Sequence, residues 1–258
     1  MLAALALAAV AVGCRPQPPA GPETPAGTPL TATAVQPTAT TGGASRPPAA
    51  ADVPTPDPTL EALYAAFQPP VQGDAAAPLL LYEFSDYRCA YCSRFALETA
   101  PAIVEQYVAQ GLVARVFIDF PIPGHGFPAY VSHEAAHCAS EQGRYWDMHH
   151  ALFAAYERLA RVDATDQGTA RQVVAEVAAE LGLDAEALGS CVASERYRPI
   201  VASLAQQAAE NGIVMTPTLL LQSEAHTEVI SGFVTFHQLQ PILDRELARA
   251  LGTPTASD

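Results

Sequence analysis

The chain has 258 residues, of which 50% are hydrophobic and 16% charged, so it holds enough apolar side chains for a substantial core. Thirteen basic residues stand against 27 acidic ones, which gives a formal net charge of -14 at pH 7. This balance argues against a nucleic-acid-binding protein, because phosphates need a basic surface.

The N-terminal residues 1–13 are apolar and end at Cys14. A run this short does not span a bilayer, which needs about 20 residues, but it is typical of a signal peptide. The stretch AVGC that ends at Cys14 resembles the lipobox of bacterial lipoproteins. We therefore expect lipidation of Cys14 and anchoring to the outer face of the cell membrane. A plain signal peptide or an uncleaved anchor is the alternative.

Residues 15–58 consist mainly of Pro, Thr, Ala and Gly and contain almost no large apolar side chain. Such a segment cannot offset its ordering entropy by burial, so we expect a disordered tether with polyproline character. The folded domain is expected at 59–252, followed by a short tail at 253–258.

The folded region shows strand and helix patterns in a distinctive order. Strand, helix and strand come first, a block of helices follows, and strand, strand and helix close the chain. The expected ranges are 79–84, 93–110, 113–120, 132–140 (with Ser132 as the N-cap), 146–156, 169–181, 184–194, 199–211, 218–222, 227–231 and 235–251. This order predicts an α/β, thioredoxin-like fold with an inserted helical subdomain at about 130–211.

Two cysteines, Cys89 and Cys92, stand where the first strand gives way to the first helix. Disulfide exchange needs a thiolate, and a helix N-terminus favours negative charge on a cysteine sulfur. Cys89 is then the attacking sulfur, and Cys92, one turn further on, is the resolving sulfur. A zinc half-site or a buried pair is the alternative, but a zinc ribbon needs a second CxxC or a His pair at suitable spacing, and neither Cys138 nor Cys191 has such a neighbour.

At these residues the chain resembles the DsbA-like thioredoxin domains. The segment GDAAAPLLLYEFSDYRCAYC, residues 73–92, is similar to the opening of those domains, and further similar positions follow in the same order over roughly residues 60–252. They are Glu134-Ala135-Ala136, Cys138-Ala139, Glu141-Gln142-Gly143, Trp146, His149, Leu152-Phe153 and Thr216-Pro217-Thr218. The resemblance implies that Pro217 is cis and packs beside Cys89, with Thr216 offering backbone bonds to a substrate peptide.

The dipeptide between the cysteines, Ala90-Tyr91, departs from the common forms of the family. The dipeptide tunes thiolate stability and hence redox poise, so it leaves the direction of electron flow open. Glu83 matches a buried acid that the family places beneath the cysteine pair, where a carboxylate relays the proton of Cys92. Asp86 is a lesser candidate, and a solvent-facing strand residue is the alternative for Glu83.

The remaining cysteines, Cys138 and Cys191, lie on separate predicted helices of the insertion. The resemblance and an oxidising compartment favour a structural disulfide between them. Two buried free cysteines are the alternative. With Cys14 lipidated, the other four cysteines pair completely.

The run His133-Glu134-Ala135-Ala136-His137 matches the HExxH motif of zinc proteases. No third His or Gly follows at the metzincin positions, so we interpret this run as the first helix of the insertion. The adjacent His149 and His150 do not face one another on a helix. We therefore expect no metal and no cofactor.

The sequence thus predicts a thiol–disulfide oxidoreductase that acts on exported proteins, introducing disulfides through Cys89 and Cys92. The expected partners are cysteine-containing exported polypeptides and a membrane redox partner of DsbB or vitamin K epoxide reductase type. One alternative is an extracytoplasmic reductase or isomerase. Another, of a different class, is a tethered metal chaperone or peptide-binding module.

Overall fold

The computed structural model describes residues 69–224 and 226–252. The predicted signal peptide with Cys14, the tether and the C-terminal tail lie outside the described residues. Within the described part of the chain, no helix is both long enough and apolar enough to cross a membrane.

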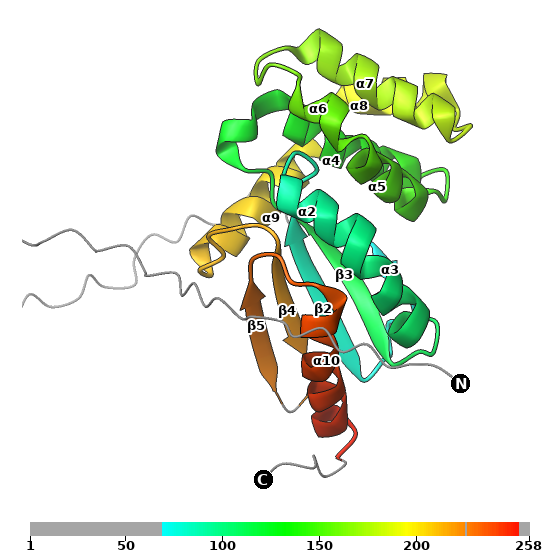
Figure 1. The fold of residues 1–258 in the computed structure, drawn as a ribbon. Coiled ribbons are helices and arrows are strands. Elements are labelled where there is room, and N and C mark those ends of the chain that lie inside the picture. The colour runs from blue at the N-terminus through cyan, green and yellow to red at the C-terminus, as the bar shows by residue number, and fades with distance from the viewer. Residues whose placement is uncertain (1–68, 225, 253–258) are drawn as a thin grey trace, which may run out of the picture. The chain divides into compact units, whose positions relative to one another are not determined.

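A five-stranded sheet in the order β1-β3-β2-β4-β5 lies at the centre of the fold (Figure 1). Strands β2 and β3 pair in parallel, and the other neighbours pair antiparallel. The strands are β1 (Val71–Gln72), β2 (Leu79–Ser85), β3 (Val113–Asp119), β4 (Thr218–Gln222) and β5 (Thr227–Ser231). The parallel pair requires a crossover helix, and this helix begins immediately after Cys89.

Three groups of helices connect the strands or follow them (Figure 1). A continuous helical segment joins β2 to β3 and consists of α2 (Ala90–Arg94), the π-helical turn η1 (Phe95–Thr99), α3 (Ala100–Ile103) and a second π-helical turn, η2 (Val104–Val108). The insertion between β3 and β4 consists of the 3-10 turn η3 (Pro123–His125), α4 (Gly126–Ser140), α5 (Tyr145–Ala154), α6 (Tyr156–Ala160), α7 (Gln167–Glu180), α8 (Ala185–Ser194) and α9 (Arg198–Glu210). Helix α10 (Phe236–Ala250) closes the fold.

The apolar side chains form two clusters. One packs a face of the sheet against the crossover helix and α10, and includes Leu81, Ile103 and Leu243. The other fills the helical insertion and contains both Cys89 and Cys92. The turn that carries the two cysteines therefore follows a strand of the sheet and packs into the apolar cluster of the insertion.

The predicted α/β, thioredoxin-like fold with a helical insertion is confirmed, and strands β4 and β5 have the predicted bounds. The predicted start of the first inserted helix is wrong. Helix α4 begins at Gly126, and Ser132 lies inside it, where its hydroxyl donates to the Pro128 carbonyl at 2.7 Å. A serine that bonds back to residue i-4 is not an N-cap. Strand β1 was missed because two residues show no alternation.

Cys138 and Cys191 form a disulfide with an S–S distance of 1.94 Å. It joins α4 to α8 inside the insertion, and both residues are buried. The resemblance implied this pairing, and the structure contains it.

Replacing both cysteines, C138A/C191A, is expected to destabilise the fold. The bond joins residues 53 positions apart, and for a loop of this size the chain-entropy relation gives a loss of about 4 kcal/mol. Urea unfolding of the variant and of the wild type measures this loss. A variant with wild-type stability would contradict the structural role of the bond.

Candidate active site

Cys89 occupies the N-cap of α2, and Cys92 lies inside its first turn. Both are free thiols in the structure. Cys89 keeps 8% of its surface exposed, whereas Cys92 is fully buried. The two sulfurs therefore differ in access: only Cys89 can be reached from solvent.

A loop between α9 and β4 lies against Cys89 and contains a cis peptide bond between Thr216 and Pro217. The Cys89 thiol donates to the Thr216 carbonyl over 3.6 Å. The cis geometry and the contact with Cys89 are those that the resemblance implied. Residues 127 positions apart in the chain thus meet at the sulfur.

The pKa of Cys89 is lowered to about 6. The largest cause is a hydrogen bond from the Cys92 thiol; the Thr216 hydroxyl and the backbone N–H groups of Cys92 and Tyr91 add to it, while burial opposes them. These N–H groups belong to the first turn of the helix, where they have no partner within the helix. Above pH 6 the reactive sulfur is therefore mainly a thiolate.

The pKa of Cys92 is raised well above its ordinary value, chiefly by burial and then by the neighbouring Cys89 sulfur. The two cysteines therefore divide the roles at neutral pH. Cys89 carries the negative charge, and Cys92 keeps its proton and donates it to that charge. This is the arrangement that disulfide exchange needs in the reduced enzyme.

Glu83 is buried on the same face of β2 as Ser85, which contacts the Cys92 side chain. The Arg115 guanidinium donates to Glu83 Oε2 at 2.8 Å, and both side chains are buried. Glu83 Oε1 has no hydrogen-bond partner. The solvent-facing alternative for Glu83 is therefore wrong, and one oxygen of its buried carboxylate has no hydrogen-bond partner.

Asp86 is fully buried and organises the turn that leads to Cys89. Its carboxylate accepts from the backbone N–H groups of Arg88 and Ile122, each at 2.7 Å, and lies 2.7 Å from His125 Nδ1. Asp86 therefore ties the cysteine turn to the loop that follows β3. Its contacts are those of an organising residue, and none of them involves Cys92.

Exposed apolar side chains stand next to Cys89 in the chain and next to the cis-proline loop. Tyr91 is 58% exposed, and Val214 and Met215, directly before the cis peptide, are 82% and 47% exposed. Solvated apolar side chains beside a reactive group provide contact area for a partner.

The histidines of the HExxH run bind a carboxylate. His133 Nδ1 and His137 Nε2 lie 2.6 Å from the two oxygens of Asp119, at the end of β3. This pairing lowers the pKa of Asp119 against the effect of its burial, which raises it. His137 Nε2 and His133 Nδ1 are thus engaged with Asp119, while His133 Nε2 is buried without a hydrogen-bond partner. The two histidines join α4 to the end of β3 through this carboxylate.

His149 is buried and hydrogen-bonded to the Tyr87 hydroxyl at 3.0 Å, whereas His150 is exposed. Burial lowers the pKa of His149 well below its ordinary value and raises that of Tyr87. The neutral imidazole therefore accepts from the tyrosine hydroxyl. The two adjacent histidines point apart, as the helical geometry predicts.

Among the described residues, His226, Glu228 and Glu246 have a spacing that suits a cation. The Arg245 guanidinium already pairs with both glutamates, at 2.6 and 3.0 Å, and that of Arg249 pairs with Glu246 at 2.8 Å. These arginines occupy the carboxylate oxygens that would bind a metal. The cluster is therefore an ion-pair network.

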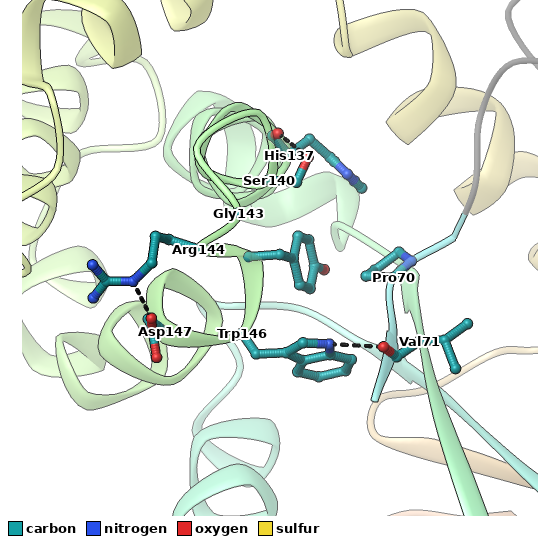
Figure 2. Close-up of a pocket in the computed structure, with 9 residues that line it drawn as sticks. Pro70, Val71, His137, Ser140, Gly143, Arg144, Trp146 and Asp147 are labelled. Carbon is teal, nitrogen blue, oxygen red and sulfur yellow. Dashed lines mark hydrogen bonds and ion pairs between the residues drawn. The ribbon is translucent and has the colours of Figure 1, made fainter. Parts of the chain in front are cut away.

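A pocket of about 390 Å³ lies between α4, α5 and β1 (Figure 2). In it the Trp146 indole N–H donates to the Val71 carbonyl at 3.2 Å, which joins the insertion to the edge strand. None of its lining residues belongs to the cysteine turn or to the cis-proline loop. The pocket therefore lies at the interface between the edge strand and the insertion and does not include the Cys89 sulfur.

Sequence reasoning missed His125 and Asp119 as parts of the site and its surroundings. Asp119 ends β3 and His125 follows six residues later. Polar residues at the carboxyl end of a parallel strand lie at the edge where sites form in α/β folds. The position of Asp119 and His125 at the end of β3 could therefore have marked them as candidates.

The sequence is similar to several known proteins. A family described as thioredoxin matches residues 66–245. The chain is 28% identical over 156 residues to the Na(+)/H(+) antiporter NhaA 3 of Salinispora tropica, a match that covers 60% of this chain but only 22% of the antiporter. It is 23% identical over 181 residues to disulfide bond formation protein D of Bacillus subtilis, covering 69% of this chain and 77% of that protein.

The fold is also similar to the crystal structure of alpha-DsbA1 from Wolbachia pipientis. The TM-score is 0.63 at 20% sequence identity, and the match covers 70% of this chain and 92% of that one. This similarity establishes the fold, including the helical insertion.

The hydrogen bond from Cys92 predicts different behaviour for two substitutions at that position. The rate of Cys89 alkylation by iodoacetamide in the reduced protein is expected to rise with a midpoint near pH 6. Cys92→Ala removes the donor, so the midpoint should move up by about one unit or more. Cys92→Ser retains an O–H donor and should stay closer to the wild type. Equal midpoints in the two variants would contradict the assigned cause.

Proposed function

The chain belongs to the thioredoxin family, and from this premise we propose that it is a thiol–disulfide oxidoreductase of DsbA-like type whose redox pair is Cys89 and Cys92. One observation carries the proposal. The sulfur of Cys89 sits at a helix N-terminus with its pKa lowered to about 6, faces a cis-proline loop, and has a buried thiol directly behind it.

In the oxidising direction the enzyme begins with a Cys89–Cys92 disulfide. A substrate thiolate attacks Cys89, forms a mixed disulfide and releases Cys92, which takes up a proton because burial raises its pKa. The second substrate thiolate then attacks the substrate sulfur of the mixed disulfide and displaces Cys89 as a thiolate. Two electrons pass from the substrate dithiol to the cysteine pair, and the substrate disulfide is formed; one proton is taken up at Cys92 and the other is released to solvent, because Cys89 leaves as a thiolate.

Glu83 is proposed as the group that exchanges the proton of Cys92. Its unpaired Oε1 and its place on the Ser85 face of β2 support this role, while Arg115 keeps the other oxygen engaged. A carboxylate beneath a buried thiol provides a local acceptor where water has no access.

The proposed direction is the introduction of disulfides. It is supported by the similarity to a disulfide bond formation protein and by the lowered pKa of Cys89. A lower pKa stabilises the reduced enzyme and so makes its disulfide a stronger oxidant. A reductase or isomerase is the second candidate, and it is favoured by a pKa well above the value of about 3.5 for DsbA.

We propose that the protein acts outside the cytoplasm on exported polypeptides, anchored through Cys14 and re-oxidised by a membrane redox partner of DsbB or vitamin K epoxide reductase type. The Cys138–Cys191 disulfide supports an oxidising compartment. The apolar side chains of Tyr91, Val214 and Met215 around Cys89 support unfolded polypeptides as substrates.

The proposal is tested by mixing the oxidised protein with reduced, unfolded ribonuclease A. The wild type is expected to oxidise the substrate, and Cys89→Ala is expected to be inactive. Cys92→Ala cannot form the redox disulfide, so it is mixed instead with disulfide-scrambled ribonuclease A. Its Cys89 thiolate should attack a substrate disulfide and accumulate as a mixed disulfide, because the resolving thiol is gone.

The double variant C138A/C191A serves as the control for cysteine removal away from the site and should oxidise the substrate wherever it is folded. Oxidation of the substrate by Cys89→Ala would overturn the proposal.

A further inference from the structure

The turn before the reactive cysteine contains a buried negative charge. Asp86 stands three residues before Cys89 and is fully buried, and its carbonyl accepts from the Cys89 N–H at 3.0 Å. Its carboxylate binds two backbone N–H groups, which carry no net charge. A second negative charge on the Cys89 sulfur is therefore opposed by this carboxylate unless a cation offsets it.

His125 is placed to offset it. Its Nδ1 lies 2.7 Å from Asp86 Oδ2, and its carbonyl accepts from the Arg88 guanidinium. His125 is thus held at both its side chain and its backbone by the residues that lead into Cys89. Its imidazole remains 29% exposed, so a proton reaches it from solvent.

No other cationic side chain of the described residues bonds to the Asp86 carboxylate. The Arg88 guanidinium is directed at backbone carbonyls, those of His125, Ala160 and Val162. The dipeptide between the cysteines, Ala90-Tyr91, contributes no positive charge. The charged groups facing His125 are therefore Asp86, Arg88 and Cys89.

The protonation states agree with this arrangement. The hydrogen bond with Asp86 is the largest cause that raises the pKa of His125 above its ordinary value; the Cys89 sulfur also raises it, while burial and Arg88 lower it. The pKa of Cys89 is lowered to about 6. His125 is consequently protonated at the pH where Cys89 loses its proton.

We infer that His125 is a positioning residue for the reactive cysteine: paired with Asp86, its imidazolium offsets the buried carboxylate and so favours the thiolate form of Cys89. The inference rests on the proposed redox role of Cys89. The loop between β3 and α4 then has a function, because it places the positively charged His125 imidazolium next to the Asp86 carboxylate.

The first test is His125→Asn in the reduced protein, with the Cys89 thiolate followed by its absorbance at 240 nm against pH. The pKa of Cys89 is expected to rise by about one unit, so the thiolate fraction at pH 6 falls about fivefold. His237→Asn is the matched control, since His237 is exposed on α10, and it should titrate as the wild type does. A folded His125→Asn protein with an unchanged Cys89 titration would overturn the inference.

The second test needs no change at His125 and so does not depend on the folding of that variant. Coupling between two charges is reciprocal, so removing the Cys89 thiolate must lower the pKa of His125 by the same amount. The His125 ring protons, followed by NMR in the reduced wild type and in Cys89→Ser, report this shift. An equal His125 pKa in both proteins would overturn the inference.

Both readouts are taken without substrate. If the protein failed to oxidise ribonuclease A yet showed the coupled titration, the proposed function would fail and the charge pairing would stand. If it oxidised the substrate but showed no coupling, only the role of His125 would be lost.

Discussion

The hydrogen bond from the buried Cys92 thiol to the Cys89 sulfur is the interaction on which the site depends. It lowers the pKa of Cys89 more than any other contact does, and it requires Cys92 to remain protonated. Burial provides that condition by raising the pKa of Cys92. The packing that excludes water from Cys92 is therefore part of the chemistry, because it sets which sulfur carries the charge.

The rest of the fold holds the two sulfurs in this relation. The crossover helix presents its first N–H groups to Cys89, and the loop before β4 brings the Thr216 carbonyl against it. The helical insertion covers Cys92 within its own apolar cluster. The disulfide between Cys138 and Cys191 belongs to the same apolar cluster and joins two helices of the insertion.

Much of this arrangement was predictable from the sequence, because it depends on local patterns. The apolar run before Cys89 and the helical spacing after it predict a cysteine at a helix N-terminus. The partner of Glu83 was not predictable. Arg115 stands on the neighbouring strand, and only the parallel register of β2 and β3 brings the two together.

The contacts of Asp119 and His125 depend on tertiary structure for the same reason. The spacing of His133 and His137 suggested a metal motif, and the sequence contained no sign that a carboxylate from the end of β3 would meet both rings. Likewise, the sequence indicates only that His125 lies in a loop, and its hydrogen bond with Asp86 is formed by the tertiary fold. Long-range pairs of charged groups are set by strand order, which local pattern does not encode.

The reduction potential of the Cys89–Cys92 couple, measured by equilibration with glutathione, tests the central claim most directly. A stabilised Cys89 thiolate favours the reduced enzyme, so the account predicts a potential clearly less negative than about -270 mV, the value for thioredoxin. A potential at or below that value would contradict the account, because it would mean that the Cys89 thiolate is stabilised no more than the reactive thiolate of thioredoxin, whose pKa of about 7 is also lowered.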